Sequence, residues 1–297
     1  MKILLLGPNG QVGRELSRTL IPHGDLVALG REQLDLASPE LVRQRLSQEQ
    51  PDVVVNAAAY TAVDKAEQEE DLSRKVNADS IAEMAAYAHE TGALVVHYST
   101  DYVFDGSKQG AYQPGDPTNP QSAYGRTKRA GEIALQESGC RHLIFRTSWV
   151  YSAHGKNFIK TMLRLASERD ELKVVADQIG APTSAELIAE VTSLALAGYR
   201  TGQLSDGIYH LTASGATSWH GLACRAVDRA IANGWKLRLR GGDIQAIGTA
   251  DFPTPAKRPA NSRLDSSDLE EALGLHFPDW TIDVDRVVDQ ITKENGS

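Results

Sequence analysis

The stretch KILLLGPNGQVGREL, residues 2–16, decides the fold. Its apolar run predicts a buried strand, Gly7, Gly10 and Gly13 predict a tight turn, and the residues after them predict a helix. Glycines in this context let backbone N–H groups approach a pyrophosphate, and the helix N-terminus adds partial positive charge. A turn that merely connects two elements is the plainer reading. The position after the first predicted strand favours a dinucleotide-binding turn.

The first half of the chain repeats the alternation of short apolar runs and amphipathic stretches. The runs at 26–30, 52–58, 94–100 and 142–150 lack strict polar alternation, as is typical of strands buried on both faces of a parallel sheet. We therefore expect an α/β fold, with a Rossmann-like doubly wound parallel sheet and a smaller α/β C-terminal substrate-binding domain. The sheet domain is expected over residues 1–150 with returning segments from about 184–234, and the second domain mainly over 151–297.

Composition limits the class of protein. The chain has 297 residues, 41% hydrophobic and 24% charged, which is ordinary for a globular protein. Its formal net charge of -8 argues against nucleic acid or an anionic membrane as the main partner. No segment has the apolar length of a membrane span, and Cys140 and Cys224 lack disulfide-framework or zinc spacing. A cytoplasmic protein is expected.

The segment LVALGREQLDL, residues 26–36, bears on the cofactor. A strand tip that prefers NAD usually carries an acidic residue for the ribose 2′-hydroxyl, whereas here Arg31 follows the strand. A guanidinium can pair with a 2′-phosphate, so NADPH is the expected cofactor and NADH the alternative. A surface arginine is the plainer reading. Asp35 and Leu36 are expected beside the adenine.

A second stretch, SAYGRTKRAGE at 122–132, places Tyr124 and Lys128 four residues apart, on one face of a helix that Ser122 can cap. Alone, such a pair is common on solvated helix faces. The run LVVHYST, however, ends at Thr100, where ligands bind in open α/β sheets. A phenol can protonate a developing alkoxide, and an adjacent ammonium is expected to lower its pKa from about 10.

These motifs together resemble the extended short-chain dehydrogenase/reductase superfamily. The segments VNAAAYTAVDKAE (55–67), HYSTDYVFDG (97–106), YGRTKRAGE (124–132), FRTSWVY (145–151), QIGAPT (178–183) and RPANSRL (258–264) narrow the resemblance to the dTDP-4-dehydrorhamnose reductases, over nearly the whole chain. The resemblance implies NADPH-dependent reduction of the C4 keto group of dTDP-4-dehydro-β-L-rhamnose. The product, dTDP-L-rhamnose, is a sugar donor for bacterial surface polysaccharides such as the lipopolysaccharide O-antigen.

The residue chemistry and the resemblance together give an expected site. Its catalytic residues are Thr100, Tyr124 and Lys128, and its substrate contacts are Thr100, Asp101, Tyr102 and Trp149. The expected cofactor contacts are Gly7, Gly10, Gln11, Val12, Gly13, Arg31, Asp35, Leu36, Ala59, Tyr60, Thr61, Tyr98, Tyr124 and Lys128. Three further residues are expected near the site. Asn77 is expected beneath it, and Arg258 and Arg263 are expected to contact the diphosphate.

Several alternatives stay open. The family's association with magnesium makes Glu186 and Glu190, at i and i+4, potential ligands, although paired surface glutamates are common. A homodimer is an expectation of the same kind. His97, His142 and His210 are interpreted as satisfied core histidines. The other functions weighed are another nucleotide-sugar ketoreductase or an epimerase, and a non-catalytic NADP-binding subunit like the regulatory subunit of methionine adenosyltransferase.

Overall fold

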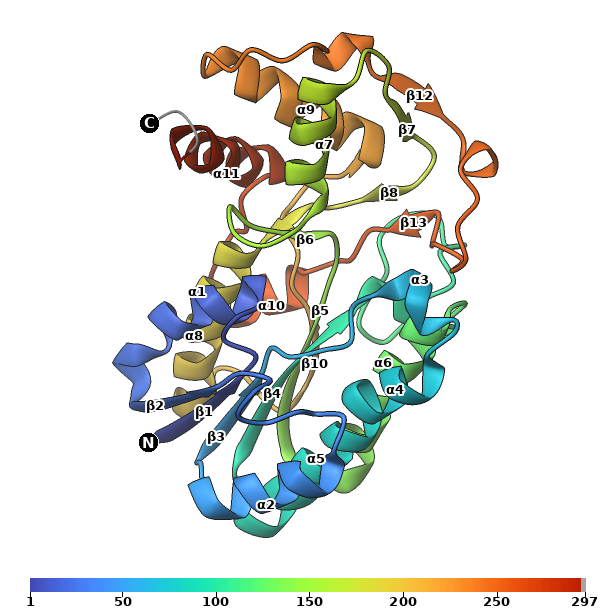
Figure 1. Cartoon of the computed structure of the whole chain (residues 1–297). Helices are drawn as coiled ribbons and strands as arrows, with labels where there is room; N and C mark the ends of the chain where they lie inside the picture. Colours follow the sequence, from blue (N-terminus) through green and yellow to red (C-terminus); the bar gives the residue numbers. More distant parts are fainter. Residues whose placement is uncertain (295–297) are drawn as a thin grey trace.

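The computed structural model of the protein describes residues 1–294, and residues 295–297, the end of the predicted second domain, lie outside the described part (Figure 1). Its centre is a six-stranded sheet in which every neighbouring pair is parallel. The order is β10 (Gly207–His210), β5 (Arg141–Thr147), β4 (Leu94–Thr100), β3 (Val53–Asn56), β1 (Lys2–Leu6) and β2 (Asp25–Leu29). The predicted doubly wound parallel sheet is confirmed.

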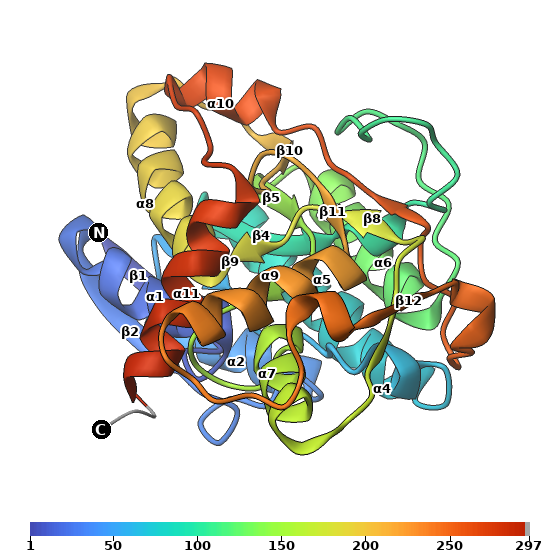
Figure 2. The ribbon, with the colours of Figure 1, turned by 90° about the horizontal axis from the view of Figure 1, so that it is seen from above.

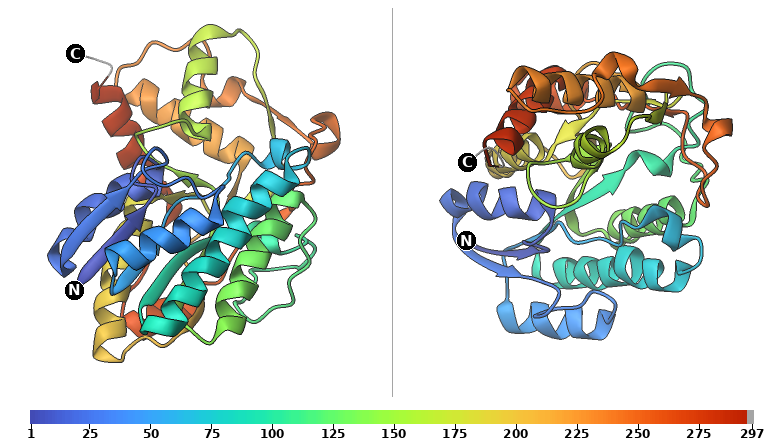
Figure 3. Two further views of the ribbon diagram at one scale, coloured as in Figure 1. Left: turned by 60° about the horizontal axis from the view of Figure 1, so that its bottom comes forward. Right: turned by 45° about the horizontal axis from the view of Figure 1, so that its top comes forward.

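Helices cover both faces of the sheet because alternate strand residues point to opposite sides. Ile3 and Leu5 belong to the core on one side, and Leu4 and Leu6 to the core on the other. Helices α2, α5 and α6 lie side by side on one face (Figure 3), and α1 packs against α8 on the opposite face. These helices are α1 (Gln11–Thr19), α2 (Pro39–Glu49), α5 (Ser80–Thr91), α6 (Ala123–Ser138) and α8 (Ala185–Thr201).

A second core lies above the sheet, where α7, α9 and α11 pack together (Figure 2). The helices are α7 (Phe158–Glu168), α9 (Trp219–Ala232) and α11 (Trp280–Glu294). Small sheets surround these helices. One has three strands, with β8 (Ile179–Gly180) between β11 (Thr217–Ser218) and β13 (Asn261–Ser262). In the two others, β7 (Lys173–Val175) pairs with β12 (Gln245–Ile247), and β6 (Val150–Tyr151) pairs with β9 (Thr183–Ser184).

Shorter helical pieces link these elements. They are η1 (Ile21–His23), α3 (Val63–Ala66), α4 (Glu70–Arg74), η2 (Lys75–Asp79), η3 (Asp101–Val103), η4 (Gly241–Asp243), η5 (Thr249–Asp251) and α10 (Ser267–Leu273). The η2 segment is a π-helical turn between α4 and α5. Within residues 1–294, no helix combines the length and the apolar character that a membrane crossing needs.

Two sequence expectations differ from the structure. The run 142–150 does not stay one strand, because Trp149 adopts a left-handed backbone with φ of 50° and separates β5 from β6. The segment expected to return to the sheet, 184–234, also divides. Helix α8 and strand β10 lie with the sheet, whereas the apolar face of α9, including Leu222 and Val227, packs into the second core.

Candidate active site

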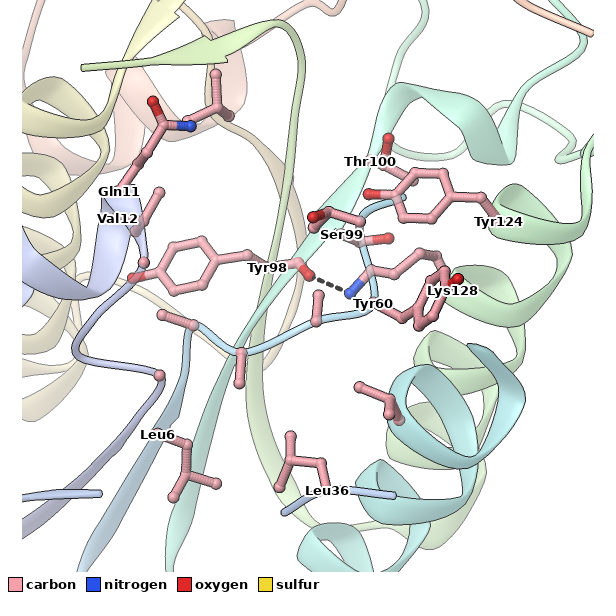
Figure 4. A pocket seen from close by; sticks show the side chains of 18 of the residues that line it. Leu6, Gln11, Val12, Leu36, Tyr60, Tyr98, Ser99, Thr100, Tyr124 and Lys128 are labelled. Carbon is pink, nitrogen blue, oxygen red and sulfur yellow. Dashed lines mark hydrogen bonds between the residues drawn. The ribbon is translucent and has the colours of Figure 1, made fainter. Parts of the chain in front are cut away.

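The sheet has its switch point between β1 and β3, whose following chains leave toward opposite faces. In open α/β sheets ligands bind outside the carboxyl ends of the strands at this point. A cavity of about 730 Å³ opens there, between the glycine turn and the start of α6 (Figure 4). Of the predicted site residues it is lined by Gly7, Gly10, Gln11, Val12, Arg31, Asp35, Leu36, Ala59, Tyr60, Thr61, Tyr98, Thr100, Asp101, Tyr102, Tyr124, Lys128 and Trp149.

The glycine turn is shaped by close backbone packing. Gly7 has φ of +81°, and a Cβ there would lie 2.8 Å from the Ala58 backbone nitrogen. A Cβ on Gly13 would lie 1.9 Å from the Gly7 carbonyl oxygen. Gly13 is therefore a packing residue beneath the turn and does not line the cavity, which corrects its expected place among the cofactor contacts. Gly10 is the N-cap residue of α1 and has no side chain to bond the helix end, so the N–H groups of the first helical turn are available to an anion.

Arg31 lies at the far end of the cavity, beyond β2. Its side chain is exposed, and Nη2 lies 3.2 Å from Asp35 Oδ2. The guanidinium is therefore free to turn toward an incoming phosphate at small cost, because exposed ion pairs contribute little. Leu36 is buried behind this pair.

Asn77 holds the cavity wall that follows β3. Its Oδ1 accepts a 2.9 Å hydrogen bond from the Tyr60 backbone N–H, and its Nδ2 donates a 3.1 Å bond to the Tyr60 carbonyl oxygen. Asn77 is 1% exposed and comes from the η2 π-helical turn. The side chain lies beneath the site, as expected, and fixes the main chain on which Ala59, Tyr60 and Thr61 stand.

Thr100 and Tyr124 meet at the other end of the cavity. Ser122 caps α6 by accepting a 3.1 Å hydrogen bond from the Gly125 N–H, which sets the first turn that carries Tyr124. The Tyr124 phenol interacts with the Thr100 hydroxyl, which donates a 3.0 Å hydrogen bond to Asp101 Oδ1. A phenolic proton and a second hydroxyl therefore face the same space (Figure 4).

Lys128 makes its hydrogen bonds to residues of β4. Its Nζ lies 2.6 Å from the Tyr98 carbonyl oxygen and 3.0 Å from His97 Nε2. Burial lowers the pKa of Lys128 to about 8, against the charge of Glu132, which raises it. Burial also raises the pKa of Tyr124 above its ordinary value, opposed by the neighbouring Thr100 hydroxyl. In this structure Lys128 does not lower the pKa of Tyr124, contrary to the expectation from spacing.

One side of the cavity has an aromatic wall. The Trp149 indole stacks on Trp219 with ring centroids 3.6 Å apart. Trp219 covers one face of the Trp149 ring, and the half-buried side chain lines the cavity. Trp149 is therefore neither a fully buried core residue nor a free surface residue. Burial raises the pKa of Asp101 to about 6, and burial together with the Asp101 charge raises that of Tyr102 to about 12.

The two arginines expected to contact a diphosphate lie in different surroundings. Arg258 Nη2 donates a 2.9 Å hydrogen bond to Asp64, and the charge of the same guanidinium acts on the Tyr102 phenol at the cavity edge. Arg263 donates to Asn261 Oδ1 at 2.8 Å. Neither lines the cavity, although Arg258 contacts a residue that does.

The magnesium hypothesis is not supported. Glu186 pairs with Arg286 and accepts a 2.9 Å hydrogen bond from Gln290, whereas Glu190 faces Arg18 at 3.8 Å. The two carboxylates thus have arginine partners instead of a shared site. Among residues 1–294 there is no group of three or more His, Cys, Asp or Glu side chains suited to a metal.

Sequence reasoning missed two residues next to the site. His97 is a buried core histidine, as expected, but one of its two ring contacts is the Lys128 amine. Trp219 backs Trp149 from α9, and no local pattern links two tryptophans 70 positions apart. The alternation of strand residues carries a signal for His97, since it lies two residues before Ser99 and therefore on the same face of β4.

The switch-point cavity, the glycine turn and the Thr100, Tyr124, Lys128 group define the class, an extended short-chain dehydrogenase/reductase. The family model described as "RmlD substrate binding domain" matches residues 1–293. A dTDP-4-dehydrorhamnose reductase of Burkholderia thailandensis is 49% identical over 286 residues, which are 94% of this chain and 95% of that protein. The chain belongs to the dTDP-4-dehydrorhamnose reductase family.

Solved structures agree with this assignment. The dTDP-4-dehydrorhamnose reductase of Clostridium acetobutylicum superposes with a TM-score of 0.88 at 36% identity, covering 98% of this chain and 99% of that one. The corresponding protein of Bacillus anthracis, solved in complex with NADP, gives a TM-score of 0.86 at 32% identity, covering 97% and 99%.

Proposed function

We propose that this protein catalyses the NADPH-dependent reduction of the C4 keto group of dTDP-4-dehydro-β-L-rhamnose, giving dTDP-L-rhamnose. Family membership over nearly the whole chain supports the activity. The observation that carries the proposal is that the Tyr124 phenol and the Thr100 hydroxyl face the cavity that begins at the glycine turn. A ketone placed there would meet a proton donor and a second hydroxyl at one oxygen.

The chain's own residues would bind, orient and protonate. Gly7 and Gly10, with the N-terminus of α1, suit a pyrophosphate, and Asn77 fixes the Tyr60 segment that walls the cavity. Bound NADPH would supply the hydride. Tyr124 would donate its phenolic proton to the carbonyl oxygen as the alkoxide develops, and Thr100 would hold that oxygen by a hydrogen bond.

The finer features of the reaction belong to the same proposal. Arg31 would favour NADPH over NADH by pairing with the 2′-phosphate, releasing Asp35. Trp149 would form the apolar wall for the deoxysugar, and Arg258 would approach the diphosphate from the edge next to Tyr102. We further propose a cytoplasmic enzyme that acts as a homodimer, which light scattering of the purified protein would test.

The test is the absorbance of the nicotinamide band when pure protein is mixed with NADPH and enzymatically prepared dTDP-4-dehydro-rhamnose. Parallel reactions contain NADH or no sugar. Substrate-dependent oxidation with dTDP-L-rhamnose as product is expected. Binding of NADPH without oxidation would overturn the proposal, and turnover of a different keto-sugar would replace its substrate.

A further inference from the structure

A buried chain of hydrogen bonds connects β3 to the lysine of the site. It runs from Asn56 on β3 to His97 on β4 and then to Lys128 on α6. Asn56 and His97 are directly opposite in the parallel pairing of β3 with β4. The exposed fractions are 1% for Asn56, 0% for His97 and 2% for Lys128, so water cannot substitute for a missing partner.

The direction of this chain follows from one backbone N–H. The Ala58 N–H can only donate, and it lies 3.1 Å from the Asn56 side-chain oxygen, Oδ1. The other end of the amide, Nδ2, therefore faces His97 Nδ1 at 3.2 Å. An amide nitrogen donates and cannot accept, so His97 Nδ1 must accept and carries no proton.

The proton of a neutral His97 then lies on Nε2. Burial lowers the pKa of His97 well below its ordinary value, so the ring is neutral. His97 Nε2 lies 3.0 Å from Lys128 Nζ, and Nζ lies 2.6 Å from the Tyr98 carbonyl oxygen. The carbonyl accepts from Nζ. An ammonium would also oppose the Nε2–H with a second donor, whereas a neutral amine has a lone pair to accept it.

We propose that His97 is a positioning residue for Lys128, held as the Nε2–H tautomer by Asn56, and that its Nε2–H favours the neutral amine of Lys128 over the ammonium until the cofactor binds. The catalytic consequence rests on the proposed function, whereas the tautomer does not. Lys128 would become an ammonium by taking one proton from solvent as it leaves His97. The positive charge beside Tyr124 would then be favoured in the assembled site.

The surroundings of Lys128 are consistent with this assignment. From β4 it faces His97 and the Tyr98 carbonyl; on α6, Tyr124 lies one turn before it and Glu132 one turn after it. The Glu132 carboxylate is occupied by Arg146 of β5 at 2.8 Å and by Arg129 at 3.0 Å. The nearest carboxylate is thus already neutralised by two guanidinium groups, and burial lowers the pKa of Lys128 to about 8.

The direct test is the tautomer of His97, read from histidine ¹⁵N shifts of the full chain without cofactor. The chain has eight histidines, and the His97→Gln variant assigns the signal. Should that variant fail to fold, Lys128→Met assigns it instead, because it perturbs the one ring that touches the amine. We expect Nε2 to be protonated and Nδ1 to be unprotonated between about pH 6 and pH 8, a range that brackets the usual histidine pKa. An Nδ1–H tautomer or an imidazolium in that range would overturn the proposal.

Kinetics supply a second readout. His97→Phe should lower kcat about tenfold, the effect of one lost buried hydrogen bond, and shift the pH profile of kcat, with KM for the nucleotide sugar unchanged. His97→Gln, which can donate its amide N–H to Lys128, should recover most of kcat. Equal losses in both variants, or an unshifted pH profile, would leave His97 as packing only. The NMR result is independent of the sugar, so failure of the substrate assignment and failure of the tautomer are distinguishable.

Discussion

Arg146 on β5 donates two hydrogen bonds of 2.8 Å, from Nε and Nη2, to the carboxylate of Glu132 on α6. The side chains are 2% and 0% exposed. Arg146 Nη1 also donates a 3.1 Å bond to the Pro114 carbonyl oxygen, in the loop that leads to α6. Because Glu132 lies one turn beyond Lys128, this pair fixes the helix that carries Tyr124 and Lys128 to the strand next to Thr100.

The first prediction concerns that pair. Glu132→Gln leaves the Arg146 charge buried without a counter-charge, so the free energy of unfolding should fall by roughly 3 kcal/mol. Glu70 offers a matched control: Arg126 also bonds it in bidentate fashion, at 3.0 and 2.8 Å, but the side chains are 45% and 46% exposed. Glu70→Gln should cost less than about 1 kcal/mol. Urea denaturation of the two variants measures the contrast, and equal losses would contradict it.

The second prediction concerns the proton donor. Tyr124→Phe removes the phenolic hydroxyl while keeping the ring that meets Tyr102 edge to face at 5.5 Å. We expect kcat to fall by about 10²–10⁴-fold, the usual contribution of general acid catalysis, with NADPH binding retained. Tyr209→Phe, which loses a hydroxyl bonded to the Ser205 carbonyl outside the cavity, is the control. Near-normal turnover of Tyr124→Phe would remove Tyr124 from the chemistry.

The third prediction concerns the choice of cofactor. Arg31→Ala should lower the ratio of kcat/KM for NADPH over NADH by about tenfold or more, since a charge-assisted contact with the 2′-phosphate is lost. Asp35→Asn should raise the same ratio, because Asp35 lies 3.2 Å from Arg31 and competes for its guanidinium. Arg14, exposed on α1 and outside the cavity lining, serves as the control. Opposite changes in the two variants distinguish phosphate recognition from a general charge effect.

The parts of the site that could be predicted depend on local spacing. The glycine turn and the Tyr124 to Lys128 spacing each occupy one short segment, so the strand and helix periods place their residues together. The doubly wound parallel sheet followed from the alternation of apolar runs and helices for the same reason. Seventeen of the eighteen residues predicted for the cofactor and substrate, all but Gly13, line one cavity; Gly13 supports the turn from beneath.

What could not be predicted depends on contacts between distant segments. The spacing of Tyr124 and Lys128 gives their helix face, but Lys128 is directed by His97 and by the Tyr98 carbonyl, which belong to another element. The end of β5 is set by Trp149, whose left-handed backbone lets its ring stack on Trp219 of α9. Neither arrangement has a periodic signal, because both result from tertiary packing.

The last prediction is a pH dependence of stability that arises from Asp101. The carboxyl is 3% exposed, and burial raises its pKa from 3.8 to about 6. Below about pH 4 both the folded and the unfolded chain hold this proton, so the group has no effect. From about pH 4 to pH 6 the unfolded chain releases the proton first, so the folded state loses up to roughly 3 kcal/mol as pH rises.

Asp101→Asn does not titrate, so its free energy of unfolding relative to the unmodified protein should rise across that interval and then stay level. Asp105 provides a control of opposite sign, because hydrogen bonds from Ser107, Tyr112 and Asn119 hold its pKa below the usual value. Asp105→Asn should therefore be destabilising at neutral pH, with the difference shrinking only as the medium becomes more acid than about pH 4. Urea titrations at a series of pH values measure both differences. A flat profile for Asp101→Asn between about pH 4 and pH 6 would mean that the carboxyl ionises at its ordinary pKa despite its burial.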